Sequence, residues 1–200
     1  MPEIAIPTSH IADRSRITRQ SPTLRSILRD ATAAEHACLD AQLGALDLCK
    51  AAGYRRFLEI NAAALLPLEQ ALVRAGVRRV LPDWDDRART RAILTDLSRL
   101  GGRPRPLDVP ELPDRFAVLG ILYVLEGSRL GAASLLRKVC QCSDPDVSGN
   151  TAFLSHGAGR PLWPSFLAIL ESHAGELADE EDIVEPVRRA FSLFTRAALS

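Results

Sequence analysis

The stretch that decides the fold of this chain is Gly120-Ile121-Leu122-Tyr123-Val124-Leu125-Glu126-Gly127-Ser128-Arg129-Leu130-Gly131. Apolar residues recur around it at helical spacing, which predicts one long helix over residues 117–138 with a buried face. Three glycines interrupt this pattern, although each interior glycine costs a helix about 0.8–1 kcal/mol relative to alanine. A cost repeated three times indicates that the missing side chains have a use.

The small residues of this predicted helix lie on one side of it. Positions 120, 127, 131 and 134 carry Gly, Gly, Gly and Ser, so successive offsets of seven, four and three residues form a groove without large side chains. One interpretation is close helix–helix packing, because small residues let two backbones approach. The other is a planar ligand on the bare backbone, with Gly127 and Gly131 letting the helix bend over it. The spacing alone leaves both open.

Composition narrows the class of protein. The chain has 200 residues, of which 46% are hydrophobic and 25% charged, so we expect one globular domain with a full core. Lys+Arg and Asp+Glu number 25 each, and the formal net charge is zero. Such a balance provides no global field for nucleic acid or an anionic membrane, and we therefore expect no nucleic-acid partner.

The sequence also bears on where the protein is located and on the state of its cysteines. We find no apolar run that approaches the ~18–20 residues of a membrane span, and no secretory signal at the N-terminus, so we expect a cytoplasmic protein without a membrane partner. In that compartment Cys38, Cys49, Cys140 and Cys142 are expected to be free thiols. A metal site built from Cys140, Cys142 and His156 is the less favoured alternative.

The remaining chain is also predicted to be helical. Residues 1–20 show no sustained period and are expected to form a flexible tail. No stretch alternates apolar and polar residues as a strand would, so we predict an all-α, single-domain helical bundle over residues 21–200. Further helices are expected over 22–46, 51–74 (with a kink or break at Pro67 and an end at Gly76), 85–100 and 161–177 and from 181, with Pro113 in the first turn of the glycine-bearing helix.

A histidine lies within the apolar stripe of the first predicted helix. The stripe follows steps of three or four residues through Leu28, Thr32, His36 and Leu39. Taken alone, His36 fits a hydrogen-bonded core residue, and arginines near it fit solvated surface charge. However, Arg29 precedes His36 by two helical turns, about 10 Å along the axis. That spacing suits a haem whose iron is bound by the histidine and whose propionate is bound by the arginine.

Four motifs resemble those of a known family. They are residues 28–36 (LRDATAAEH), 123–131 (YVLEGSRLG), 153–157 (FLSHG) and 163–166 (WPSF). Together they resemble the biliverdin-forming heme oxygenases, most closely the bacterial type that accompanies bacteriophytochromes. The resemblance covers roughly residues 22–200 and implies a helical bundle of heme oxygenase type.

This resemblance implies an activity and an axial ligand. Haem b would be both cofactor and substrate, opened by O₂ and electrons to biliverdin, CO and iron. His36 matches the family's proximal iron ligand. Gly127, Ser128 and Gly131 match the distal wall that restricts where oxygen can react. No flavin or nicotinamide motif is visible, so electrons would come from an external donor such as reduced ferredoxin.

The resemblance also implies contacts and partners. Arg29 matches a residue that contacts a haem propionate, and we include Arg25 and Tyr123 as further haem contacts. Biliverdin would serve a bacteriophytochrome, with iron release for nutrition as another purpose. For the second nitrogen of His36, Glu35 and Glu59 are the candidate partners.

Two other functions stay open. Ser128 stands where other members of the family have a distal aspartate, and residues 161–178 contain no Lys or Arg to bind a propionate. These differences favour, as the main alternative, a haem- or tetrapyrrole-binding protein on the same fold with weak or no turnover. The third hypothesis is a helical interaction module in which the glycines only pack and His36 is a core residue.

Overall fold

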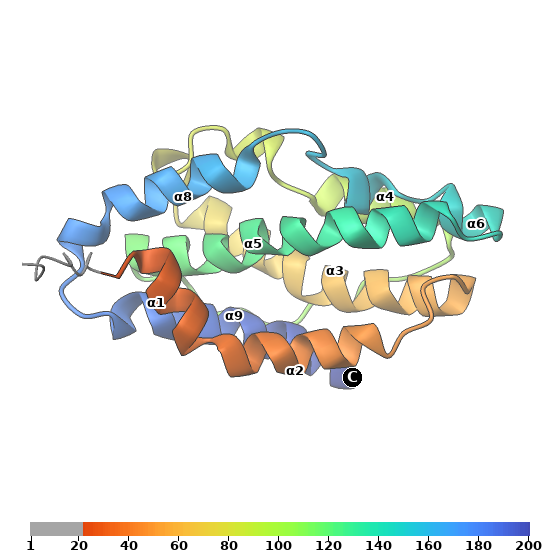
Figure 1. Ribbon diagram of the computed structural model, residues 1–200, viewed down its shortest axis with the longest axis horizontal. Helices are drawn as coiled ribbons and strands as arrows, with labels where there is room; N and C mark the ends of the chain where they lie inside the picture. The colour runs from red at the N-terminus through yellow and green to blue at the C-terminus, as the bar shows by residue number, and fades with distance from the viewer. Residues whose placement is uncertain (1–21) are drawn as a thin grey trace, which may run out of the picture.

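The computed structural model describes residues 22–200, and every regular element in this part of the chain is a helix (Figure 1). The all-α prediction is therefore confirmed, while the predicted tail over residues 1–20 lies outside the described residues. The α-helices are α1 (Leu24–Ala31), α2 (Ala33–Gly44), α3 (Ala51–Arg74), α4 (Thr90–Arg99), α5 (Arg115–Cys140), α6 (Pro145–Ser148), α7 (Ala152–Ser155), α8 (Leu162–Ser172) and α9 (Glu181–Leu199). Short 3₁₀ helices are η1 (Val77–Arg79), η2 (Trp84–Asp86) and η3 (Ala174–Glu176).

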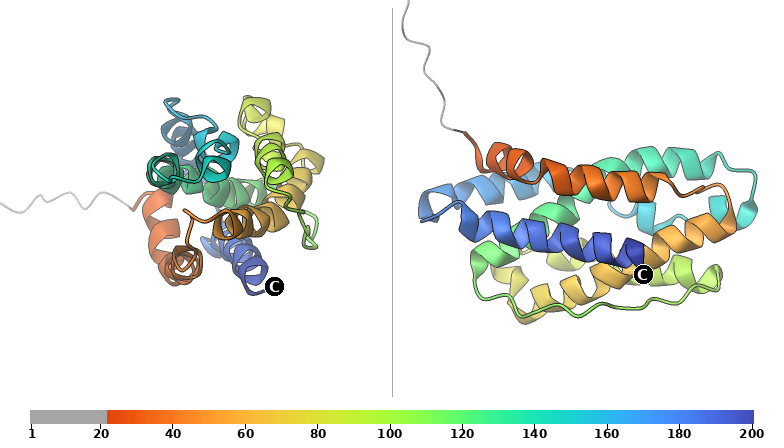
Figure 2. Two further views of the ribbon diagram at one scale, coloured as in Figure 1. Left: turned by 90° about the vertical axis from the view of Figure 1, so that its right-hand side faces the viewer. Right: turned by 90° about the horizontal axis from the view of Figure 1, so that it is seen from below.

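Helix α5, which carries the glycines, runs through the middle of the bundle. It packs most extensively against α9 and further against α7 and α8, while α1 and α2 run below it in Figure 1. Helix α9 also lies alongside α2 (Figure 2). A Cβ added at Gly120 would lie 2.8 Å from Cβ of Pro186 and 3.0 Å from the Ile183 carbonyl oxygen. Gly120 therefore serves close packing of α5 on α9.

The apolar character of α5 exceeds what the sequence led us to expect. Within residues 22–200 it is the one helix long and apolar enough to cross a membrane, with a mean hydropathy of 1.4 over 18 residues. We expected no apolar run as long as a membrane span, and by length and composition this expectation was wrong. Half of this window is buried in the bundle, including Leu119 and Leu122. A central helix is apolar on several faces because neighbours cover it on several sides.

The first predicted helix is broken into α1 and α2. The break falls at Thr32, where φ is −123° and ψ is 18°, and the Thr32 hydroxyl donates a 2.7 Å hydrogen bond to the Leu28 carbonyl. A threonine that bonds back to the preceding turn favours such a bend. At the other end of α1, the Glu171 carboxylate of α8 accepts hydrogen bonds from the Leu24 and Arg25 amides at 3.1 and 3.0 Å. These contacts set α1 at an angle to α2 (Figure 1).

Other helix ends differ from the predictions by a few residues. Helix α3 occupies residues 51–74 as predicted, with Pro67 inside it and Gly76 beyond its end in the left-handed region (φ 78°). The helix predicted over 85–100 begins only at Thr90, because the Glu69 carboxylate accepts hydrogen bonds from the Arg89 and Thr90 amides at 2.7 and 3.0 Å.

Two more helices begin or end at residues other than those predicted. Helix α5 begins after Asp114, whose carboxylate accepts the Ala117 amide at 2.8 Å. Pro113 therefore precedes the helix rather than forming its first turn. The helix predicted over 161–177 ends at Ser172 and continues as η3.

A disulfide joins Cys49 to Cys142, with their Cα atoms 5.2 Å apart. The expectation of four free thiols was therefore wrong, because the fold brings together two cysteines that are 93 residues apart in sequence. Cys38 and Cys140 are exposed and unbonded to each other. Residues 22–200 contain no group of three or more metal-binding side chains placed to hold an ion, so the site from Cys140, Cys142 and His156 is not formed.

Candidate functional site

A cavity of about 580 Å³ lies between α1 and α2 on one side and α5 on the other. Its volume is in the range of small-molecule and cofactor sites. All seven residues singled out from the sequence line it. They are Arg25, Arg29 and His36 from α1 and α2, and Tyr123, Gly127, Ser128 and Gly131 from α5.

His36 lies on the α2 wall with 62% of its side chain exposed. Its Nδ1 is 3.0 Å from the Asp40 carboxylate, one helical turn further along, and its ring meets the edge of Phe191 of α9. If Nδ1 carries the proton donated to Asp40, Nε2 is unprotonated and has the lone pair that a metal needs.

The partner of His36 was not one of the two predicted residues. Glu35 lies 3.6 Å from Arg188, and Glu59 accepts a 3.3 Å hydrogen bond from the Arg103 amide. The sequence did contain the relevant signal, because residues four apart on a helix are neighbours and Asp40 follows His36 at that spacing.

The opposite wall is the glycine face of α5. A Cβ added at Gly131 would meet nothing within 4 Å, and one at Gly127 would meet only the Trp163 ring at 3.6 Å. Both glycines therefore leave backbone open to the cavity, whereas Gly120 packs on α9. The packing interpretation thus applies to Gly120, while the ligand interpretation stays a prediction for Gly127 and Gly131.

Cations gather at the α1 end of the cavity. Arg25 and Arg29 line it close to Tyr123. Arg29 also pairs with Asp30 at 2.8 Å in an exposed contact, which is a weak attachment that a stronger anion can replace. Burial raises the pKa of Tyr123, and the nearby positive charges of both arginines oppose this shift. The arrangement suits a ligand with carboxylates on one edge.

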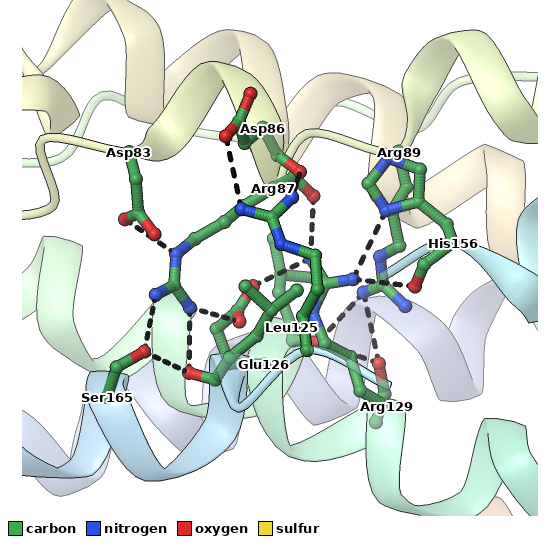
Figure 3. A network of polar contacts seen from close by, with 12 residues as sticks. Asp83, Asp86, Arg87, Arg89, Leu125, Glu126, Arg129, His156 and Ser165 are labelled. Atoms are coloured by element: carbon green, nitrogen blue, oxygen red, sulfur yellow. Dashed lines mark hydrogen bonds and ion pairs between the residues drawn. The ribbon is translucent and has the colours of Figure 1, made fainter. Parts of the chain in front are cut away.

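A buried ionic network surrounds Glu126 of α5 (Figure 3). The Glu126 carboxylate accepts hydrogen bonds from Arg87 at 2.7 Å and from Arg129 at 2.9 Å, and the side chains of Glu126 and Arg87 are each 1% exposed. Arg87 also donates to Ser165 and Asp83, both at 2.7 Å. Removing one partner of such a buried pair costs about 3–5 kcal/mol. The network therefore holds α5 against α8 and the loop before α4.

Sequence reasoning assigned no role to these residues. The one available signal was Glu126, a carboxylate within an otherwise apolar helical run, because a buried acid requires a cation. That signal does not identify Arg87, which lies 39 residues earlier.

Arg89 connects this region to the cavity. Its Nη2 donates to the Leu125 carbonyl at 2.8 Å and to the Ser128 hydroxyl at 3.0 Å, and its guanidinium lies 5.2 Å from the centre of the Phe153 ring. Arg89, Ser128 and Phe153 all line the cavity. The Ser128 hydroxyl itself donates to the Leu125 carbonyl at 2.8 Å, so it is hydrogen-bonded within the protein.

His156 lies at the outer side of the network, where it is partly buried. Its Nδ1 and its carbonyl oxygen are 3.4 and 3.3 Å from Nη1 of Arg129. Burial lowers the pKa of His156, and the positive charges of Arg129 and Arg89 lower it further. The neutral imidazole is thus the form that fits beside these arginines.

The described fold is that of a heme oxygenase. The chain superposes on the NO- and CO-bound heme oxygenase of Neisseria meningitidis with a TM-score of 0.71 and 22% sequence identity, over 89% of this chain and 91% of that one. Heme oxygenase PigA of Pseudomonas aeruginosa is 34% identical over 134 residues, which cover 64% of this chain and 66% of that protein, just under two thirds of its length. This chain therefore shares the fold of a heme oxygenase and is similar in sequence to another. No family model matches it.

Proposed function

We propose that this protein is a heme oxygenase that binds haem b in the cavity and opens it to biliverdin, CO and iron. The observation that carries the proposal is the pairing, across one cavity, of His36 with the bare backbone at Gly127 and Gly131. The proposal rests also on the PigA relative, which is named a heme oxygenase. When bound, haem supplies the iron at which O₂ is activated and the ring carbon that is oxidised.

In this proposal His36 would bind the haem iron. The Asp40 carboxylate lies 3.0 Å from Nδ1, so a proton on Nδ1 would face Asp40 and leave Nε2 free to bind iron. Phe191 meets the imidazole with ring centroids 5.7 Å apart and limits its rotation. His36 thereby has a preferred orientation before the ligand arrives.

The other residues orient the ring. Arg25 and Arg29 bind the propionates at the α1 end, and Tyr123 covers that edge. Gly127 and Gly131 let α5 approach the flat face, and Ser128 belongs to the same distal wall. The residues present fit haem, since a metal ligand, a cationic end and a flat open face belong to one largely apolar cavity.

We further propose a cytoplasmic site of action and an external electron donor such as reduced ferredoxin. Biliverdin is proposed to pass to a bacteriophytochrome, a part of the proposal that rests on the motif resemblance alone.

A haem-binding protein with little turnover is the second candidate. The observation in its favour is Ser128, whose hydroxyl is engaged with Arg89 and the Leu125 carbonyl and which provides no carboxylate to hold distal water.

The test is an absorption titration of the purified protein with hemin, followed by ferredoxin and its reductase in air. We expect a Soret band that decays as biliverdin absorption rises in the wild type. In His36→Ala the axial ligation is lost and no biliverdin accumulates. His173→Ala is the matched control, because His173 lies outside the cavity.

Three outcomes separate the candidates. A stable Soret band that resists reductant and O₂ would favour the binding protein. Identical haem spectra in the wild type and His36→Ala would contradict His36 as ligand. No haem binding at all would contradict haem as the ligand of this cavity.

A further inference from the structure

We propose that Arg89 is an anion-binding residue, which holds a small anion in the part of the cavity beside Ser128. The inference rests on the proposed function, because it concerns the distal side of the same cavity. Arg89 is 4% exposed, lines the cavity, and comes from the loop between η2 and α4. None of the four motifs that resemble the family includes this residue.

The guanidinium of Arg89 has no acidic partner. No carboxylate oxygen of residues 22–200 lies within 4.0 Å of its nitrogens. The two buried acids nearby are engaged with other groups. Glu69 accepts the amides of Arg89 and Thr90 together with the Thr90 hydroxyl, and both oxygens of Glu126 accept from Arg87 and Arg129. Both carboxylates attract the Arg89 charge through space, but neither contacts the guanidinium.

The hydrogen bonds of Arg89 leave donor capacity unused. Nη2 donates to the Leu125 carbonyl and the Ser128 hydroxyl, while Nε and Nη1 have no acceptor among the described residues. A guanidinium has five N–H donors, so most of its donor capacity is available to a ligand. Burial lowers its pKa to about 10, and the group is therefore still a cation at neutral pH.

The position of Arg89 favours a small anion over the carboxylates of haem. Arg25 and Arg29 gather near Tyr123 at the α1 end, which is the end proposed for both propionates. Arg89 instead contacts Ser128, next to the open backbone of Gly127. It supplies a positive charge on the wall where Ser128 supplies no carboxylate. A small anion there gains a charge-assisted hydrogen bond from the guanidinium.

The first test uses the ferric-haem-loaded protein and compares fluoride with neutral imidazole as added ligands, followed by absorption. We expect Arg89→Gln to weaken fluoride binding about 10- to 100-fold and to change imidazole binding by less than about threefold. Arg89→Lys, which keeps the charge, recovers part of the loss. Arg160→Gln is the matched control, because Arg160 is exposed and pairs with Asp86 outside the cavity.

Two results of these titrations would contradict the assignment of Arg89 to a small anion. Equal fluoride affinity in the wild type and Arg89→Gln would overturn the inference. So would an Arg89→Gln variant that binds haem more weakly but binds haem dimethyl ester like the wild type, because Arg89 would then hold a propionate.

A second test needs neither haem nor a folded variant. Crystals of the haem-free wild type soaked in sodium bromide should show an anomalous peak within about 4 Å of the Arg89 guanidinium. Absence of this peak would overturn the anion site. A peak there in a protein that takes up no haem would support the site while contradicting the proposed function.

Discussion

His36 and Asp40 lie one turn apart on α2, with Nδ1 of the imidazole 3.0 Å from a carboxylate oxygen. Both side chains are mostly exposed, so the pair gains little stability as an isolated ion pair. A carboxylate beside a ligating histidine commonly orients the ring, and this is the role we propose for Asp40.

We therefore expect Asp40→Asn to weaken haem affinity about tenfold. This is the lower end of the roughly 10- to 100-fold loss of metal affinity that is usual when such a carboxylate is removed, and we expect the lower end because Asp40 is exposed to water. The measurement is hemin affinity by Soret titration, together with the ferric spectrum, while the melting temperature stays close to that of the wild type. Asp146→Asn, at the distant α6, is the control. Unchanged affinity and spectrum in Asp40→Asn would show that the pair has no part in ligation.

Two glycines of α5 should respond oppositely to the same substitution. Gly131→Ala restricts the backbone of the unfolded chain without a steric clash in the fold, so it should stabilise the protein by about 0.5–1 kcal/mol. The same substitution should weaken haem binding about tenfold, because the new Cβ enters the cavity. Gly120→Ala should destabilise by about 1–3 kcal/mol, because its Cβ would collide with α9. Urea unfolding and hemin titration measure both effects. Tight haem binding by Gly131→Ala would contradict a ligand on this face.

The Cys49–Cys142 disulfide should stabilise the fold. It closes a separation of 93 residues, and such a cross-link restricts the unfolded chain by an amount typically worth about 2–4 kcal/mol. We expect dithiothreitol, or the substitution Cys49→Ser, to lower the urea midpoint accordingly, with Cys140→Ser as the exposed control. Alkylation of the unreduced, unfolded protein should label Cys38 and Cys140. Labelling of all four cysteines would contradict the bond.

His156 should make stability depend on pH. Its folded-state pKa is below the ordinary value of about 6.5, chiefly through burial and then through Arg129, so the unfolded chain binds the proton more readily. Its contribution to stability is then present above about pH 6.5 and is lost as the pH falls below that value. The free energy of unfolding of the wild type should drop more between about pH 7.5 and 5.5 than that of His156→Gln. Parallel pH profiles for the two proteins would contradict this assignment.

Local patterns were enough to predict the helical class. Steps of three and four residues identified most of the helices, and α3 was predicted at its observed ends. The errors at Thr32 and Thr90 have one cause in common, since side-chain hydrogen bonds to the backbone shifted or interrupted a helix that apolar spacing alone would continue. The spacing of apolar residues does not record such hydrogen bonds, so it does not predict these two helix boundaries.

The candidate site was accessible from sequence only where its residues share a helix. His36 with Arg29, and Gly127 with Ser128 and Gly131, are close in the chain, and their relative positions follow from the helical rise and turn. Sequence reasoning could not assign His36 to one side of a cavity and the glycines to the other. The roles of these residues remain predictions for the experiments above.

The sequence by itself determined the α-helical class, the long apolar helix and the residues that face one side of it, because these depend on neighbours three or four positions apart. Only the tertiary structure decided which glycine packs and which opens to the cavity, that Cys49 meets Cys142, and that Arg89 reaches Ser128 across 39 residues. Contacts between distant parts of the chain depend on how whole helices pack, and no local period records that packing.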